Sequence, residues 1–109
     1  MKFVIETPDF RPSPSLKEFI KSKISKLEKL YPGINSIEIT LEKESRKSKE
    51  IIKCSINIRI PGRDEYVKAS AVIFEDAILK AVENAQRRLR IRKTQLLATR
   101  KKRVKEKGK

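Results

Sequence analysis

The chain has 109 residues with 28 basic and 14 acidic side chains, and the resulting net charge of +14 points to a polyanionic partner. Its length fits one domain with its own core, and the lone Cys54 excludes an intramolecular disulfide. Because the sequence has no histidine and no phosphate-binding, dinucleotide-binding or metalloprotease motif, we expect no enzyme, no metal and no cofactor.

Residues 2–6 (KFVIE) predict a short strand, and a proline-rich link leads from it into a helix. Ser13 is the expected N-cap, with Pro14 at the first helical position. Ser15 and Glu18 offer a competing capping box, and a proline–glycine pair ends the helix. Apolar residues at helical spacing predict that one face belongs to the core: Leu16, Phe19, Ile20, Ile24, Leu27, Leu30 and Tyr31.

Three strands follow, each with alternating apolar and polar residues. The first covers residues 37–42, and a polar turn at residues 43–50 leads into the second, at residues 52–60. A proline–glycine turn precedes the third, whose inward residues are expected to be Val67, Ala69, Ala71 and, at its end, Ile73. Cys54 lies on the apolar side of its strand, so we interpret it as a small buried hydrophobe rather than a reactive thiol.

The last helix is predicted to begin near Phe74, and its buried stripe comprises Ala77, Ile78, Ala81, Val82, Ala85, Leu89 and, one heptad on, Leu96. These elements predict an α+β fold of order β-α-β-β-β-α, with one four-stranded sheet and two helices packed on one face. We place the domain at residues 1–95. Residues 96–109 are expected to be a basic C-terminal helical extension or a disordered tail.

Basic residues gather in two places along the chain. Residues 87–109 contain 12 of the 28 basic residues and a single acid, Glu106. Several basic residues of the two helices have no acid three or four positions away, namely Lys23, Lys26, Lys29, Arg88, Arg90, Arg92 and Lys93. Others do have such an acid, namely Lys21, Lys80 and Arg87. Unopposed like charges destabilise a helix, so a polyanion outside the helix is expected to compensate them.

Nucleic acid fits these charges better than a membrane surface does, because residues 87–107 contain few bulky apolar residues and no aromatic one. We take the outward positions of the sheet to be Glu38, Thr40, Glu42, Lys53, Ser55, Asn57, Arg59, Lys68 and Ser70, which include no aromatic residue. This argues against a base-stacking sheet and favours helix-borne Lys and Arg that bind phosphates. Without a signal peptide or a long apolar segment, a cytoplasmic protein is expected.

Both helices resemble those of a known family. Residues 13–16 (SPSL) and 23–29 (KISKLEK) resemble the first helix of the ribosome hibernation-promoting factors, long described as sigma-factor modulation proteins. Residues 74–78 (FEDAI) and 87–90 (RRLR) resemble their second helix, and the turn at residues 60–62 also fits. The resemblance covers residues 1–95 and implies the same strand and helix order as the one derived above.

The resemblance implies a translation inhibitor that binds ribosomal RNA of the small subunit and occludes the channel for mRNA and tRNA. Ribosomes would be stored in this way during stress and stationary phase. By position, basic residues of both helices would contact RNA: Lys23, Lys26, Lys29, Arg87, Arg88 and Arg90, with Arg92 and Lys93 added from their unopposed charge. Asn84 and Ile91 stand where the family usually has lysine.

No catalytic residue, metal ligand or small-molecule substrate is expected, and we predict a monomer when the protein is free. Two other interpretations stay open. The chain could be a free-standing RNA- or nucleic-acid-binding protein that shares only the fold. It could also be a regulator of transcription that acts through protein interactions.

Overall fold

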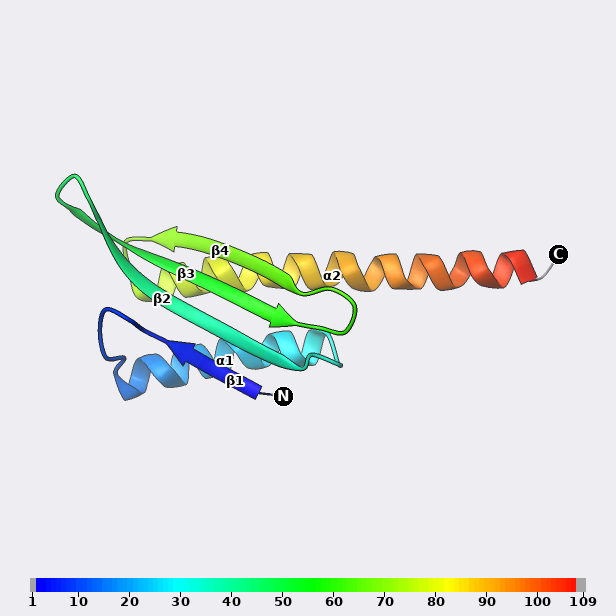
Figure 1. Cartoon of the computed structure of the whole chain (residues 1–109), viewed down its shortest axis with the longest axis horizontal. Helices are drawn as coiled ribbons and strands as arrows, with labels where there is room; N and C mark the ends of the chain where they lie inside the picture. Colours follow the sequence, from blue (N-terminus) through cyan, green and yellow to red (C-terminus); the bar gives the residue numbers. More distant parts are fainter. Residues whose placement is uncertain (1, 108–109) are drawn as a thin grey trace.

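The computed structural model describes the backbone of residues 2–107 and the side chains of residues 2–96. Its elements, in chain order, are β1 (Lys2–Glu6), α1 (Pro14–Leu30), β2 (Ser36–Arg46), β3 (Lys49–Arg59), β4 (Glu65–Ala71) and α2 (Phe74–Lys107). The predicted α+β class and the order β-α-β-β-β-α are confirmed (Figure 1).

The four strands form one mixed sheet in the order β1-β2-β3-β4. β1 runs parallel to β2, and the other two pairs are antiparallel. A parallel pair needs a long crossover connection, which α1 supplies between β1 and β2. Both helices lie on the same face of the sheet, side by side and pointing in the same direction (Figure 1). The opposite face of the sheet is left open, and β1 and β4 form its edges.

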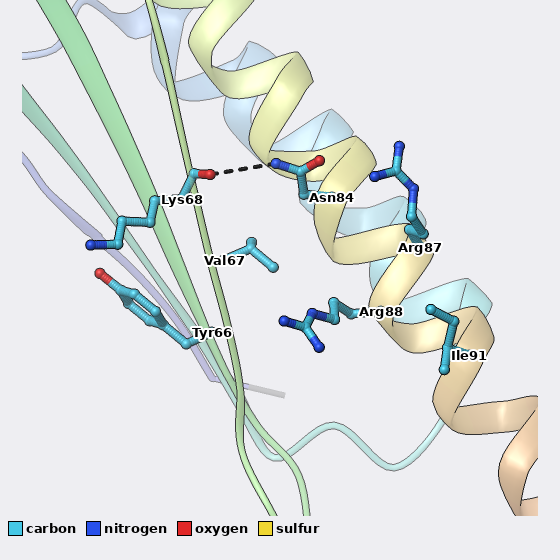
Figure 2. A pocket seen from close by; sticks show the side chains of 7 residues that line it. All are labelled: Tyr66, Val67, Lys68, Asn84, Arg87, Arg88 and Ile91. Carbon is cyan, nitrogen blue, oxygen red and sulfur yellow. Dashed lines mark hydrogen bonds between the residues drawn. The ribbon is translucent and has the colours of Figure 1, made fainter.

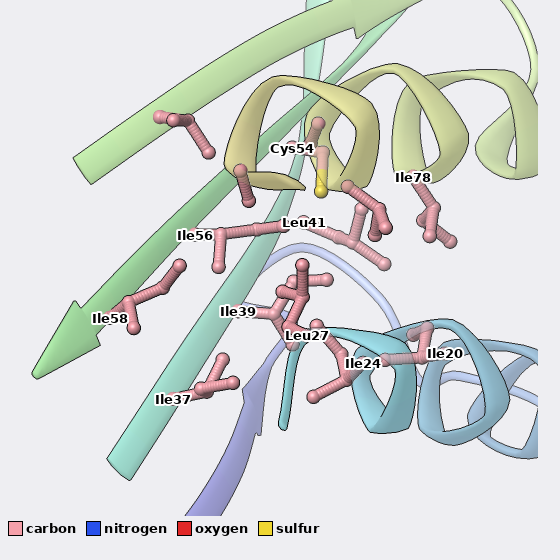
Figure 3. Close-up of a cluster of buried hydrophobic side chains, with 14 of the residues drawn as sticks. Ile20, Ile24, Leu27, Ile37, Ile39, Leu41, Cys54, Ile56, Ile58 and Ile78 are labelled. Atoms are coloured by element: carbon pink, nitrogen blue, oxygen red, sulfur yellow. The ribbon is translucent and has the colours of Figure 1, made fainter. Parts of the chain in front are cut away.

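The core lies between the sheet and the two helices (Figure 3). The alternation predicted for the strands is confirmed, because Ile37, Ile39 and Leu41 of β2 and the facing residues of β3 are buried. Cys54 is fully buried among them, as predicted. Its burial raises the pKa of the thiol to about 12, because a thiolate at this position would lose its hydration.

The hairpin between β2 and β3 is longer than the sequence suggested. The predicted polar turn at residues 43–50 shrinks to Lys47 and Ser48, both with positive φ angles of 44° and 66°. Polar residues extend both strands because the backbone ladder continues to the pair of Arg46 and Lys49, and some of their side chains also meet across the hairpin. Lys43 Nζ lies 3.7 Å from Glu50 Oε1, and Lys53 Nζ lies 3.9 Å from Glu44 Oε2.

The beginning of α1 agrees with the first of the two predicted starts. Ser13 is the N-cap, and its Oγ accepts a hydrogen bond of 3.1 Å from the backbone N–H of Leu16. Two predicted core positions are wrong. Ile73 is 54% exposed because β4 ends at Ala71, and Leu96 is 49% exposed because α2 has by then passed the edge of the sheet.

The C-terminal half of α2 projects beyond the sheet (Figure 1). Leu89 is the last fully buried residue of α2 among the described side chains, while the helix continues to Lys107. The molecule is accordingly elongated, with principal extents of 64 × 29 × 18 Å. Within the part of the chain that the structure describes, no helix is long and apolar enough to span a bilayer. A domain boundary at residue 95 remains a prediction.

Candidate nucleic-acid interface

The first group of candidate residues, Lys23, Lys26 and Lys29, lies on α1 and is called the α1 ridge below. The helix buries its apolar stripe against the sheet, so Lys26 and Lys29 are exposed to solvent. Neither makes an ion pair among the described side chains. Lys23 is half-buried, and its Nζ lies 5.3 Å from the centroid of the Phe19 ring in a cation–π contact.

The second group lies on α2. Arg87, Arg88, Arg90 and Lys93 are exposed, and none makes an ion pair among the described side chains. The acids one helical turn from Arg87, Lys80 and Lys21 do not form the expected local pairs within that part of the chain. Exposed partners of this kind gain little from a fixed contact in water. More helix cations therefore lack a contact ion pair than the sequence indicated.

Arg92 is different, and the prediction that it lacks an acidic partner is wrong. Its Nη1 lies 3.2 Å from Glu65 Oε2, and the two side chains are only 14% and 8% exposed. Nη2 donates to the carbonyl oxygen of Pro61 at 2.9 Å, and Nη1 also donates to the carbonyl oxygen of Arg63. The guanidinium of Arg92 is bound to the β3–β4 turn, so a phosphate would have to displace these contacts. Contact between Arg92 and RNA stays a prediction.

A groove of about 420 Å³ separates the edge strand β4 from α2 (Figure 2). It is lined by Tyr66, Val67, Lys68, Asn84, Arg87, Arg88 and Ile91, and we call it the β4–α2 groove. Asn84 Nδ2 donates a hydrogen bond of 3.4 Å to the backbone oxygen of Lys68, which ties α2 to the edge of the sheet. The lining includes three cationic side chains and no acid.

Tyr66 is the residue that the sequence reasoning missed. It is 53% exposed, and it projects onto the open face of the sheet, so the expectation that this face has no aromatic residue is wrong. The signal was available, since Tyr66 directly precedes the inward-facing Val67 and must therefore point outward. A shallow hollow beside its ring is lined by Glu38 and Glu42 and by no cation, although Glu38 is ion-paired with Arg59, whose Nε lies 3.3 Å from Glu38 Oε1.

Among the described residues, no group of three or more Cys, Asp or Glu side chains lies close enough together to hold a metal ion. Every buried side-chain nitrogen and oxygen in this part of the chain has a hydrogen-bond partner. What the described surface offers is positive charge on two adjacent helices.

Comparison with known proteins agrees with the resemblance seen in the two helices. Residues 3–97 match the family described as sigma 54 modulation protein / S30EA ribosomal protein. The chain belongs to this family. The match includes every candidate basic residue from Lys23 to Lys93.

A relative in the sigma 54 modulation protein / S30EA ribosomal protein family is the ribosome hibernation promoting factor of Acinetobacter guillouiae. It is 30% identical, with 77% of this chain and 80% of that protein covered. The N-terminal domain of Protein Y from Thermus thermophilus superposes with a TM-score of 0.67 at 15% identity, covering 82% of this chain and 96% of that domain. A ribosomal subunit interface protein from Coxiella burnetii gives 0.68 at 21% identity, covering 86% and 99%. These two structures show a shared fold.

Proposed function

We propose that this protein is a ribosome-associated translation inhibitor. It binds ribosomal RNA of the small subunit, occludes the channel for mRNA and tRNA, and so promotes hibernation of the ribosome. Inhibition is steric, without chemistry on a substrate. The protein binds as a monomer in the cytoplasm and needs no cofactor.

One observation carries the proposal, namely that both helices present unpaired cations from the same layer of the fold. α1 and α2 lie side by side on one face of the sheet, with the α1 ridge on one helix and Arg87, Arg88, Arg90 and Lys93 on the other. Such an array matches the spaced phosphates of folded RNA, whose backbone it would bind through shape and charge. The similarity to a ribosome hibernation promoting factor and to a ribosomal subunit interface protein supports the ribosome as the source of the bound RNA.

The first test is co-sedimentation with isolated small subunits on a sucrose gradient. We expect binding by the natural protein and weaker binding when the α1 ridge is changed to glutamine. A matched control changes Lys2, Lys47 and Lys49 to glutamine, which removes the same charge from the sheet layer. If the ridge variant and the control lose affinity equally, binding is nonspecific and the proposed interface is wrong.

The second test addresses occlusion. Small subunits that already hold mRNA and a tRNA should bind the protein less well than empty subunits, because the same channel is occupied. The α1 ridge variant should also inhibit translation in a cell-free system less than the control variant does. Equal binding to empty and programmed subunits would show that the channel is not the binding place. Binding to free RNA or to RNA polymerase alone would favour the two alternatives.

A further inference from the structure

The β4–α2 groove combines features that the phosphate-binding helices alone do not need. Lys68, Arg87 and Arg88 supply three exposed cations, while Tyr66 and Ile91 add apolar surface that is 53% and 50% exposed. Figure 2 shows Tyr66 and Lys68 on one side of β4, with the Arg88 guanidinium directed toward the strand from α2. Cations beside an exposed aromatic ring fit a ligand that has both phosphate and a flat base.

We infer that a single-stranded RNA segment crosses the edge of β4 with one unpaired nucleotide, from the Tyr66 ring on the open face of the sheet to the β4–α2 groove. The base of this nucleotide stacks on the ring of Tyr66, and the phosphates on either side contact Lys68, Arg87 and Arg88. This inference rests on the proposed function, because the segment would belong to ribosomal RNA. Beyond that function, we expect part of the binding free energy to come from stacking of a base on Tyr66 rather than from contacts with the phosphate backbone.

Electrostatics determine where the phosphates can lie. The three cations of the groove have no acid among the lining residues and no ion pair within the described part of the chain. The hollow on the other side of Tyr66 contains two acids. Glu38 is paired with Arg59, whereas Glu42 makes no ion pair among the described side chains and repels phosphate. A strand that places a base on Tyr66 is therefore directed over the edge of β4 toward α2, not across the open face of the sheet.

The site is held in shape before a ligand arrives. The hydrogen bond from Asn84 to the backbone of Lys68 fixes the distance between helix and strand, and Val67 anchors the floor of the groove in the core. A duplex would not fit this chemistry, because its bases are stacked on each other and only an unpaired base can lie on the ring.

The chain offers a direct readout, because it has two tyrosines and no tryptophan. In a Tyr31→Phe variant, Tyr66 is the only strong intrinsic fluorophore. We expect an unstructured oligouridylate of about eight nucleotides, a length within the usual site size for single strands, to quench this emission with saturation. An RNA duplex and a polyglutamate of similar length should leave it nearly unchanged. If polyglutamate quenches as strongly as the oligonucleotide, charge alone explains binding and the base-stacking inference is overturned.

Substitutions then distinguish the contribution of base stacking from that of phosphate contacts. Affinity is measured by the fluorescence anisotropy of a labelled oligouridylate. Tyr66→Leu should weaken binding about five-fold or more through loss of one stacked base, whereas Tyr66→Phe should keep the natural affinity. Arg88→Gln should lower the slope of log K against log salt by about 0.7, the value for one phosphate contact on a single strand. Lys17→Gln, which removes the same charge from α1 outside the groove, is the matched control and should change the slope less.

The outcomes for the groove and for the ribosome can be told apart. If the protein co-sediments with small subunits but Tyr66→Leu binds both subunits and oligouridylate like the natural protein, the groove inference is wrong and the proposed function stands. If the protein does not co-sediment with subunits but Tyr66→Leu still weakens oligouridylate binding, the groove binds single-stranded RNA and the proposed function fails. Far-UV circular dichroism of each variant confirms that it is folded, as expected for a change at a half-exposed position.

Discussion

Arg92 Nη1 on α2 lies 3.2 Å from Glu65 Oε2 at the start of β4, joining residues 27 positions apart in the sequence. Two carbonyl oxygens of the β3–β4 turn, those of Pro61 and Arg63, also accept hydrogen bonds from the same guanidinium. Arg92 is placed three residues beyond the last buried leucine of α2. It therefore fixes the point at which the helix leaves the sheet and the direction in which its basic residues project.

Replacing Arg92 by methionine keeps the apolar stem but leaves the Glu65 carboxylate, only 8% exposed, with the exposed Arg63 at 3.8 Å as its remaining ion-pair partner among the described side chains. We expect a loss of about 3 kcal/mol in the free energy of unfolding, the usual cost of removing one partner of a buried ion pair. Urea unfolding followed by circular dichroism measures it. Arg90→Met, at an exposed neighbouring position, is the control and should change stability by less than about 0.5 kcal/mol.

A double variant tests whether the loss comes from the stranded charge. Glu65→Leu combined with Arg92→Met removes both charges and should recover most of the stability lost in Arg92→Met alone. An Arg92→Met protein as stable as the Arg90→Met control would contradict a stabilising role for the pair.

The β2–β3 hairpin turns through two residues that strongly prefer negative φ elsewhere. Lys47 and Ser48 have φ angles of 44° and 66°, the combination for which two-residue turns favour asparagine followed by glycine. The double substitution Lys47→Asn with Ser48→Gly should raise the free energy of unfolding by about 1 kcal/mol through relief of left-handed strain. Thermal unfolding is the measurement, and an unchanged or lower midpoint would count against the turn geometry. Ser48→Val should shift the midpoint in the opposite direction.

Much of the fold could be predicted from the sequence because the governing signals are local. Alternation in β2 and β3 assigns their inward faces, and the Ser13 cap marks the start of α1. The pairing of Arg92 with Glu65 could not be predicted. The charge pattern within one helix does not indicate which residue of a strand, 27 positions earlier in the sequence, will contact it. The ends of the hairpin strands were missed for a related reason, since the backbone ladder between the two strands extends over polar residues that are not buried.

Only part of the candidate site could be predicted from the sequence. Helical spacing singled out the α1 ridge and the exposed cations of α2, and whether these bind RNA remains a proposal. The β4–α2 groove was not foreseen, because it forms where a strand edge meets a helix far from it in sequence. Tyr66 was visible in the alternation of β4 but was omitted from the outward positions.

Neutralising the α1 ridge should affect binding far more than stability. Lys26→Gln and Lys29→Gln should leave the melting temperature nearly unchanged, since neither lysine has an ion-pair partner among the described side chains. Lys23→Gln should cost about 0.5 kcal/mol because it removes the contact with the Phe19 ring. Differential scanning calorimetry of the three single variants is the check. A large loss in Lys26→Gln or Lys29→Gln would assign these lysines to the fold rather than to a partner.

The buried thiol of Cys54 predicts a specific dependence of stability on pH. Burial raises its pKa from 9.0 to about 12, so below pH 9 both the folded and the unfolded chain keep the proton. Above that pH the unfolded chain loses the proton first, and the free energy of unfolding should fall by about 1.4 kcal/mol per pH unit until the folded pKa is reached.

Cys54→Ala isolates this effect from the titration of lysines and tyrosines. The variant is expected to be less stable than the natural protein at about pH 7 because it leaves a small cavity. The difference between the two proteins should narrow steadily as the pH rises from about 9 to about 10.5 in urea titrations. A constant difference over that range would mean that the thiol does not remain protonated in the folded protein.

The position of β1 at a parallel edge bears on how the protein opens. β1 pairs with β2 alone, and only Phe3 and Ile5 of its side chains pack against the core. Its detachment would leave the antiparallel strands β2, β3 and β4 and both helices in contact, so it is the natural unit of partial unfolding. Backbone amides of β1 would then exchange with solvent hydrogen through this local release, well before those of β3 at the centre of the sheet. β1 pairs with a strand that follows α1 in the sequence, so its contacts join residues far apart along the chain. Such contacts form slowly, and β1 would therefore be among the last segments to pair during folding.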